Sequence, residues 1–377
     1  MSWFMKTDVI QVDPASVDSD VIARAAAVVD GGGLVAFPTE TVYGIACSAS
    51  TESLRRLDHI KKRPPGKHYT LHIGSPATVR RYVPHTSMRA DKLMRKAWPG
   101  PLTIVFDVSD QDMAKQRKRL GDEACGHLYG QHSIGIRCPD NPVATALLDA
   151  CKRPVVAPSA NLSGDRPATD AASVVSQFAN QLDMVLDAGR CRFSQSSTVV
   201  KLGRGPLEVL RPGAYSERLL AELSTVQILM VCTGNTCRSP MAEGLFRKHL
   251  TEKLDCKVDR LAEFGYKVLS AGTLDMGGSM ASSEAINACA ALGVDLLGHR
   301  SRALTCELVA DSDLIYVMSR AHRAAVLAID PDAADKVLLL AGDAEVPDPI
   351  GQGQRVFDEC AATIDRAVKE RISELRI

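Results

Sequence analysis

The residues best suited to covalent chemistry are a cysteine and an arginine six positions apart, in Cys232-Thr233-Gly234-Asn235-Thr236-Cys237-Arg238-Ser239-Pro240. An apolar run at 227–231 predicts a strand before this motif, and apolar periodicity at 239–252 predicts a helix after it. Backbone N–H groups at such a strand-to-helix turn can surround an anion, and their field favours the thiolate of Cys232. The guanidinium of Arg238 can bind two phosphate oxygens. The motif therefore predicts attack of a thiolate on phosphorus and a cysteinyl-phosphate intermediate.

A carboxyl group for proton transfer lies much later in the chain, in the polar loop at 347–351. Asp348 precedes Pro349 there, and its carboxyl is suited to protonating a leaving atom and then activating water. A lone cysteine at a strand–turn junction is more often a buried structural residue, but the complete set favours catalysis. Cys232 and Cys237 do not have the spacing of zinc ligands, and no His is placed to complete a site, so no resident metal is predicted.

The C-x5-R-S motif followed by a distant D-P pair resembles the low-molecular-weight protein tyrosine phosphatase family over about 227–373. The segments 270–273, 299–302 and 313–318 also look like family landmarks. The resemblance implies that Cys232 is the nucleophile, Arg238 binds phosphate and Asp348 is the general acid. It also implies that Asn235 and Ser239 organise the phosphate loop of Thr233, Gly234, Asn235, Thr236, Cys237 and Ser239. Cys237 is expected to form a reversible disulfide with Cys232 that protects the nucleophile.

Two positions bear on the leaving group. Ile350-Gly351 stands where tyrosine-selective relatives carry aromatic residues, and Thr236 precedes the second cysteine. This pattern resembles the bacterial branch of the family that acts on phosphoarginine. Phosphoarginine is therefore favoured as the natural substrate, and phosphotyrosine remains open.

Three polar segments in the first half of the chain follow predicted strands. They are Pro38–Gly44, the basic segment with Lys61, Arg63 and Lys67, and Ser159–Gly164. Loops at the carboxyl ends of strands are where open α/β sheets bind ligands, and cations with hydroxyls suit a triphosphate and a small polar molecule. Taken singly, the basic segment fits a solvated helix end and Ser159-Ala160-Asn161 fits a helix cap.

Together these segments resemble the YrdC-type threonylcarbamoyl-AMP synthase family over about 15–213, as do 98–103, 136–139, 197–199 and 211–213. The resemblance implies that L-threonine, bicarbonate and ATP give threonylcarbamoyl-AMP and pyrophosphate, with Mg²⁺ on the ATP. A partner complex would then transfer the group to tRNA, and direct tRNA binding is not expected. The implied threonine-binding residues are Thr39, His72, Arg137, Ser159 and Ser197. The implied ATP-binding residues are Lys61, Arg63, Lys67, Ser133, Asn161, Thr169 and Arg211. Two features depart from the family: His68-Tyr69 replaces the usual Pro-Leu, and a polar stretch at 110–131 is extra.

The alternation of β-branched runs with amphipathic segments predicts an α/β fold throughout. The first domain, 1–213, is expected to have a twisted mixed sheet. A linker at 214–226 leads to a second domain, 227–377, with a doubly wound, four-stranded parallel sheet. Predicted strands lie at 34–37, 70–73, 102–106, 134–137, 155–157, 198–202, 227–231, 267–270, 314–318 and 336–340. Predicted helices lie at 20–30, 52–59, 86–96, 143–151, 239–252, 282–292, 320–328 and 353–373.

Composition limits the remaining possibilities. The 377 residues carry 45 basic and 45 acidic side chains, and a neutral chain argues against a protein that binds nucleic acid through a strongly basic surface. The absence of a leader pattern, together with 11 scattered cysteines, predicts a cytoplasmic protein with reduced thiols and no membrane segment.

Two alternatives to a bifunctional enzyme stay open. The first domain could bind nucleotide or RNA without synthesis, so that the chain acts solely as a phosphatase. The second domain could only bind phosphoproteins. The sequence does not indicate an oligomeric state or a reason for joining the two domains.

Overall fold

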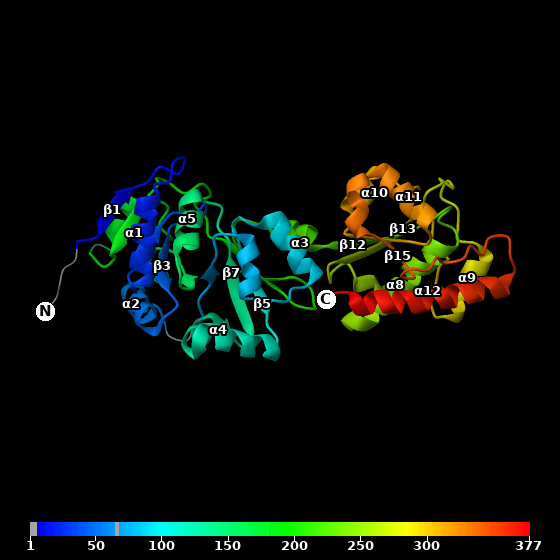
Figure 1. The fold of residues 1–377 in the computed structure, drawn as a ribbon, viewed down its shortest axis with the longest axis horizontal. Helices are drawn as coiled ribbons and strands as arrows, with labels where there is room; N and C mark the ends of the chain where they lie inside the picture. Colours follow the sequence, from blue (N-terminus) through cyan, green and yellow to red (C-terminus); the bar gives the residue numbers. More distant parts are fainter. Residues whose placement is uncertain (1–5, 65–67, 179) are drawn as a thin grey trace. The chain divides into compact units, whose positions relative to one another are not determined.

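A computed structural model describes residues 6–64, 68–178 and 180–377 (Figure 1). The chain divides into two compact units. One comprises residues up to Gly203 together with Leu207–Leu223, and the other comprises Arg204–Pro206 and Ser224–Ile377. Each unit has its own sheet and is described by itself.

The N-terminal unit is built on a mixed sheet with the strand order β1-β9-β2-β3-β8-β4-β7-β5-β10-β11, and β6 pairs with β7. The sheet combines parallel pairs such as β5–β10 with antiparallel pairs such as β5–β7, which confirms the predicted twisted mixed α/β fold. The strands are β1 (Asp8–Gln11), β2 (Val35–Phe37), β3 (Gly44–Ser48), β4 (Leu71–His72), β5 (Leu102–Asp107), β6 (Tyr129–Gly130), β7 (Ser133–Arg137), β8 (Val155–Val156), β9 (Met184–Asp187), β10 (Thr198–Leu202) and β11 (Glu208–Arg211).

Helices cover this sheet and bury apolar faces against it. They are α1 (Ser19–Asp30), α2 (Thr51–Lys61), α3 (Met88–Ala97), α4 (Asp110–Leu128), α5 (Pro142–Ala150), α6 (Ala171–Phe178) and α7 (Glu217–Ser224), with the 3₁₀ turn Pro76–Arg81. In α1 the Asp18 carboxylate caps the first turn, and Ile22, Ala25 and Val29 are buried. The α1 face packs with α5 in one apolar cluster, so the helix is held by burial as well as by its cap.

Two further segments have regular structure in this unit. The stretch at 110–131 was predicted only as an extra polar segment, and 214–226 was predicted as a linker. The polar stretch at 110–131 forms α4 and β6, with Ser109 as the helix cap and a break in helical geometry at Gly121, whose φ is 84°. The α7 helix falls within the predicted linker, yet Leu220 is fully buried in the same core cluster as Trp98 and Leu102. Its burial makes α7 part of the N-terminal unit.

The C-terminal unit contains four parallel strands in the order β13-β12-β14-β15, which confirms the predicted doubly wound parallel sheet. The strands are β12 (Val226–Cys232), β13 (Tyr266–Gly272), β14 (Leu314–Val317) and β15 (Val337–Leu339). The helices are α8 (Arg238–Leu254), α9 (Ser283–Ala291), α10 (Cys306–Asp311), α11 (Arg320–Ile329) and α12 (Gln354–Glu374), with 3₁₀ turns at Val258–Arg260 and Pro331–Lys336. Within this unit α8, α9 and α12 lie on one side of the sheet and α10 and α11 on the other (Figure 1).

The central strand β12 is buried along its whole length, as expected for a parallel strand covered on both faces. It pairs with β13 on one side and β14 on the other. This position directs its carboxyl end, and therefore Cys232, to the edge of the sheet where α/β folds bind ligands.

Candidate active sites

The Cys232 loop joins the end of β12 directly to the start of α8 at Arg238. None of the backbone N–H groups from Thr233 to Cys237 donates a hydrogen bond to another described residue. At the positive end of a 17-residue helix, these free donors form a cradle for an anion. Gly272 at the end of β13 permits this loop geometry, since a Cβ atom there would lie 2.7 Å from the carbonyl oxygen of Thr233.

Asn235 organises the interior of the loop. It is fully buried and has the left-handed backbone conformation, with φ of 53°. Its Nδ2 donates to Ser239 Oγ and to Ser270 Oγ, each at 2.8 Å, and its Oδ1 accepts from the backbone N of Arg302 at 2.9 Å. Ser239 Oγ in turn lies 3.0 Å from Cys232 Sγ. The chain of contacts places the Ser239 hydroxyl beside the sulfur, within hydrogen-bond distance of it.

Arg238 and Asp348 meet at this loop, although 110 positions separate them in the chain. Arg238 Nη2 lies 2.5 Å from Asp348 Oδ2, and Nη1 donates to the carbonyl oxygen of Val346 at 3.3 Å. The guanidinium is buried, with 6% of the side chain exposed, whereas the Asp348 side chain is 42% exposed. Arg238 Nε is buried without a hydrogen-bond partner, so the guanidinium still has a donor to offer a bound oxyanion.

A histidine that the sequence analysis did not select also lies at the loop. His322 Nε2 is 2.9 Å from Thr233 Oγ1, and its Nδ1 is 2.9 Å from Ser319 Oγ. Burial, followed by the charge of Arg238, lowers the pKa of His322, which favours the neutral ring beside the first residue of the loop. The residue lies in α11, far from the motif in sequence, and no spacing rule connects the two.

Cys237 is a free thiol in the structure, as is Cys232. Its Sγ contacts Ser282 Oγ at 3.6 Å and Thr236 Oγ1 at 3.7 Å. Gly234, the remaining loop residue, faces Met276, since a Cβ atom there would lie 3.2 Å from Met276 Cγ. The reversible disulfide therefore remains a prediction.

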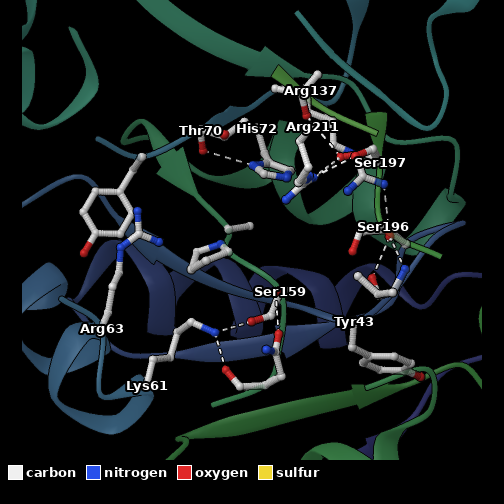
Figure 2. A pocket seen from close by; sticks show the side chains of 18 of the residues that line it. Tyr43, Lys61, Arg63, Thr70, His72, Arg137, Ser159, Ser196, Ser197 and Arg211 are labelled. Carbon is white, nitrogen blue, oxygen red and sulfur yellow. Dashed lines mark hydrogen bonds between the residues drawn. The ribbon is translucent and has the colours of Figure 1, made fainter. Parts of the chain in front are cut away.

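The second candidate site is a cavity of about 680 Å³ in the N-terminal unit (Figure 2). Among the predicted residues, its lining includes Thr39, Lys61, Arg63, His72, Arg137, Ser159, Asn161, Ser197 and Arg211. They come from the loop after β2, the end of α2 and the residues just after it, β4, β7, the loop after β8, the residue just before β10, and β11. The fold thus gathers nine predicted side chains, spread over 173 positions from 39 to 211, around one cavity.

Lys61 and Arg63 lie on one side of this cavity (Figure 2). Lys61 is buried, and its Nζ donates to the carbonyl oxygens of Ser159 and Asn161, each at 2.5 Å. Burial, followed by the nearby Arg63 charge, lowers the pKa of Lys61 to about 8. Ser159 Oγ donates to Asn161 Oδ1 at 2.5 Å, so the Ser159–Asn161 loop is held both by its own side chains and by Lys61.

Arg137 and Arg211 lie on the other side, beside His72 and Ser197 (Figure 2). Arg211 Nη2 donates to the carbonyl oxygen and the hydroxyl of Ser197 at 2.7 and 3.0 Å. Arg211 thus lies with the residues predicted to bind threonine, although the sequence assigned it to ATP. Burial, followed by the charge of Arg137, lowers the pKa of His72 to about 3, so the ring is neutral.

A buried carboxylate fixes Arg137. Arg137 Nη2 donates to Glu40 Oε1 at 2.9 Å and to Thr41 Oγ1 at 2.5 Å, and the Glu40 side chain is only 1% exposed. Arg137 Nε is buried without a hydrogen-bond partner. Glu40 lies within the Pro38–Gly44 segment that the sequence singled out, but its pairing with Arg137 was not predicted.

Among the described residues, two predicted ATP-binding residues, Ser133 and Thr169, are not among those lining the cavity. Ser133 begins β7 and its hydroxyl donates to the carbonyl oxygen of Gly130, and the carbonyl oxygen of Thr169 accepts from the backbone N of Cys191. Lys67 lies outside the described residues. Lining residues that the sequence analysis did not select include Tyr43, His68, Tyr69, Thr70, Thr103 and Ser196.

The His68-Tyr69 departure from the family pattern forms part of the cavity wall. The Arg63 guanidinium lies 4.3 Å from the centroid of the Tyr69 ring, and the Tyr69 hydroxyl bonds to Asp58. The backbone N of Tyr69 donates to the carbonyl oxygen of His127 in the extra helix α4. The two departures are therefore in contact, and together they shape the Arg63 side of the cavity.

Across residues 6–64, 68–178 and 180–377, no group of three or more His, Cys, Asp or Glu side chains is arranged to hold a metal ion. Within the same described ranges, no helix has both the length and the apolar character needed to cross a membrane.

Family profiles match both units. The Sua5/YciO/YrdC profile, described as telomere recombination, matches residues 27–213, and the low-molecular-weight phosphotyrosine protein phosphatase profile matches residues 227–376. The phosphatase Etp of Escherichia coli K12 is 37% identical over 154 residues, which are 95% of that protein and 40% of this chain. The chain belongs to the low-molecular-weight protein tyrosine phosphatase family through its C-terminal unit, and residues 27–213 form a Sua5/YrdC domain.

The relatives of the N-terminal unit are synthases. Threonylcarbamoyl-AMP synthases of Pyrococcus abyssi and Bacillus subtilis are each 31% identical, over 230 and 228 residues. The chain spans 64% and 62% of their lengths. A solved structure of P. abyssi Sua5 in complex with L-threonine is 20% identical, with a TM-score of 0.50 and coverage of 97% of this chain and 98% of that one. At 20% identity, the likeness to this solved structure concerns the fold alone. The sequence relatives show that both units are homologous to enzymes.

Proposed function

We propose that the chain is a bifunctional enzyme with a cysteine-dependent phosphatase site and a threonylcarbamoyl-AMP synthase site. The observation that carries the phosphatase assignment is the Cys232 sulfur beside Ser239, at the base of a loop whose N–H groups are free. These donors, together with the Nε of Arg238, match the several oxygen atoms of a phosphate group.

In the proposed reaction, the Cys232 thiolate attacks the phosphorus atom while the P–O or P–N bond to the leaving group breaks. Asp348 gives its proton to the leaving atom. Water then attacks the cysteinyl-phosphate, Asp348 accepts a proton from it, and the sulfur leaves as a thiolate that the Ser239 hydroxyl stabilises. The Asp348–Arg238 pair supports this cycle, because an incoming phosphate competes for Arg238 and frees the carboxyl group.

The test is hydrolysis of an aryl phosphate by the full chain and by Cys232→Ser. The variant should lose turnover, whereas Cys306→Ser, an exposed cysteine in the same unit, should keep it. Turnover by Cys232→Ser at the unaltered rate would refute the mechanism. Binding of phosphoproteins without turnover by the unaltered chain would instead support a sensor.

We favour phosphoarginine over phosphotyrosine as the natural leaving group. Thr236 stands beside Cys237, and the rim residue Ile350 is 67% exposed and cannot stack on a phenyl ring. Comparison of phosphoarginine and phosphotyrosine peptides as substrates decides this point. A higher kcat/KM for phosphotyrosine would overturn the preference.

The synthase proposal rests on the two separated cation groups of the N-terminal cavity. Lys61 and Arg63 would bind the ATP phosphates, while Arg137 and Arg211, with Thr39, His72, Ser159 and Ser197, would hold threonine and its carbamate. L-Threonine and bicarbonate form the carbamate with loss of water, and a carbamate oxygen attacks the α-phosphorus as pyrophosphate leaves. No side-chain nucleophile is required, and the site acts by positioning and charge neutralisation.

A magnesium ion would accompany the ATP. The described residues that line the cavity include no Asp or Glu, so the phosphates and water would supply its ligands. The product would pass to a tRNA-modification complex, and the requirement for a free Cys232 thiolate favours a reducing compartment such as the cytoplasm.

The synthase test is release of pyrophosphate from ATP. Release should require both L-threonine and bicarbonate and should fall strongly in Lys61→Met, while Lys62→Met, the exposed neighbour, serves as the matched control. ATP binding without pyrophosphate release would favour the alternative of a nucleotide-binding module joined to a phosphatase.

A further inference from the structure

A cavity of about 600 Å³ in the C-terminal unit lies between α8 and the segment at 293–302. Neither Cys232, Arg238 nor Asp348 lines it. Its lining consists of Pro240, Glu243, Gly244, Arg247, Lys248, Val258, Gly293, Val294, Asp295, Leu296, Gly298, His299, Arg300 and Arg302. The cavity is thus separate from the phosphatase site, although it shares α8 with it.

The walls combine an apolar surface with an excess of positive charge. Val294 and Leu296 are buried, and Val258 is 49% exposed. The contact between α8 and Val294 is close, because a Cβ atom on Gly244 would lie 2.5 Å from Val294 Cγ1. The lining also includes four cationic side chains and two carboxylates.

Three of the four cations already have partners. Arg247 pairs with Glu243 at 3.4 Å, Lys248 donates to the carbonyl oxygen of Leu292, and Arg300 donates to two backbone carbonyl oxygens. The Arg302 guanidinium has no hydrogen bond or ion pair to any residue in the described part of the chain. One available guanidinium matches one carboxylate, which it can hold through two parallel N–H donors.

We propose that this cavity binds a small carboxylate with an apolar body and that its occupancy acts on the phosphatase site. The carboxylate pairs with Arg302, and the apolar body rests on Val258, Val294 and Leu296. Such a combination of an apolar wall and a few directed polar groups is typical of small-molecule sites.

The link to the phosphatase site runs through Asn235. Three residues that line the cavity hold it: the backbone N of Arg302 donates to Oδ1, His299 Nε2 lies 2.7 Å from its carbonyl oxygen, and Glu243 acts through Ser270. Ser270 Oγ donates to Glu243 Oε2 at 2.6 Å and accepts from Asn235 Nδ2 at 2.8 Å. A ligand bound to the segment at 299–302 therefore contacts the residues that hold Asn235, which in turn bonds Ser239 beside Cys232.

The binding experiment uses 2-naphthoate, a rigid apolar ring system with one carboxylate, and the full chain saturated with inorganic phosphate to occupy the phosphate loop. Calorimetry should show one site that Arg302→Ala removes or weakens at least tenfold. Arg355→Ala, an exposed arginine of α12 outside the cavity, is the matched control and should bind like the unaltered chain. The neutral analogue 2-naphthalenemethanol should not bind at this site.

The second readout, which rests on the proposed phosphatase function, is kcat for a saturating aryl phosphate. Competition at the phosphate loop does not alter kcat, so a rise of about fivefold with naphthoate, lost in Arg302→Ala, reports the coupling. Equal binding by Arg302→Ala, or no binding, overturns the site, and binding without a change in kcat overturns the coupling. A chain that binds naphthoate through Arg302 but hydrolyses no phosphate contradicts the phosphatase proposal and leaves the site intact.

Discussion

Replacement of Asn235 by glycine tests whether a single buried amide sets the second half of the phosphatase reaction. The amide donates to Ser239 Oγ at 2.8 Å, which leaves the Ser239 proton for Cys232 Sγ, 3.0 Å away, or for the carbonyl oxygen of Ala271, 3.5 Å away. Glycine keeps the left-handed backbone without strain but removes that donor. A hydrogen bond to a charged group contributes about 1.5–3 kcal/mol, and loss of its orientation should forfeit roughly 1–2 kcal/mol.

That loss corresponds to a roughly 5- to 30-fold lower kcat, and it should fall on the step in which sulfur leaves as a thiolate. The assay is rapid mixing with an aryl phosphate. Because the cysteinyl-phosphate forms faster than it breaks down in Asn235→Gly, the initial burst of phenol should rise toward one equivalent per enzyme.

The variant Asn235→Ala distinguishes the effect of losing the side-chain amide from the effect of straining the backbone. It also lacks the donor to Ser239, but alanine in the left-handed conformation costs about 1 kcal/mol more than glycine. Equal kcat values for the two variants, with a less stable alanine form, support the amide. A kcat that falls in step with stability, or a slow variant without a burst, refutes the reasoning.

Three further predictions concern both units. Gly272→Ala should lower phosphatase kcat/KM at least tenfold by steady-state assay and leave pyrophosphate release unchanged, because its Cβ would clash with the phosphate loop. The pKa of Lys61 is lowered to about 8, so its charged form is lost as pH rises through this value. The KM for ATP should therefore rise above pH 8, whereas Lys61→Met should show a high KM at every pH. Glu40→Ala should destabilise the N-terminal unit by about 3–5 kcal/mol, since it leaves the charge of Arg137 buried and unpaired, as measured by urea unfolding with Trp98 fluorescence.

Each of these predictions has a result that contradicts it. An unaltered kcat/KM in Gly272→Ala would mean that the loop relaxes without cost. A KM for ATP that is constant from pH 6 to 9 would show that Lys61 does not contact the nucleotide as a cation. A Glu40→Ala midpoint equal to that of the unaltered chain would mean that solvent replaces the carboxylate.

Local patterns were sufficient to predict much of the fold. The apolar run Gln227–Val231 and the periodicity after Arg238 predicted the ends of β12 and α8 to within two residues. Both patterns depend only on residues that are close together in the chain, so they can be recognised from the sequence. The edge strand β1 was missed, since its four residues are mostly exposed and carry no buried pattern. The helix α4 was read as a polar stretch because a glycine breaks it and few of its residues are buried.

In the candidate sites as well, residues that are close in sequence could be predicted, whereas pairs that are distant in sequence could not. Cys232, Asn235 and Ser239 lie in one motif, and their spacing predicts a common loop. His322 and Glu40 act through partners 89 and 97 positions away, and only the folded sheet reveals those pairs. Glu243 was within reach of sequence reasoning, since it lies four positions after Ser239 and therefore on the same face of α8.

Both candidate sites contain an arginine–carboxylate pair, but the two carboxylates have different roles. The exposure of each carboxylate to solvent decides whether it fixes its arginine or releases it. In each, a buried arginine keeps an unpartnered Nε and bonds a carboxylate through Nη2: Arg137 with Glu40, and Arg238 with Asp348. Glu40 is 1% exposed and Asp348 is 42% exposed. A sealed carboxylate cannot exchange its partner for water, so Glu40 stays in place and fixes the direction of Arg137.

An exposed carboxylate loses little when its partner turns to a substrate, because water solvates it at once. Asp348 can therefore release Arg238 to an incoming phosphate and become available for proton transfer. By this reasoning, Glu40→Gln should mainly weaken the orientation of Arg137 and raise the KM for threonine. Asp348→Asn should leave phosphate binding at Arg238 nearly unchanged while it slows departure of the leaving group, and a larger effect on phosphate affinity than on kcat would show that Asp348 acts as Glu40 does.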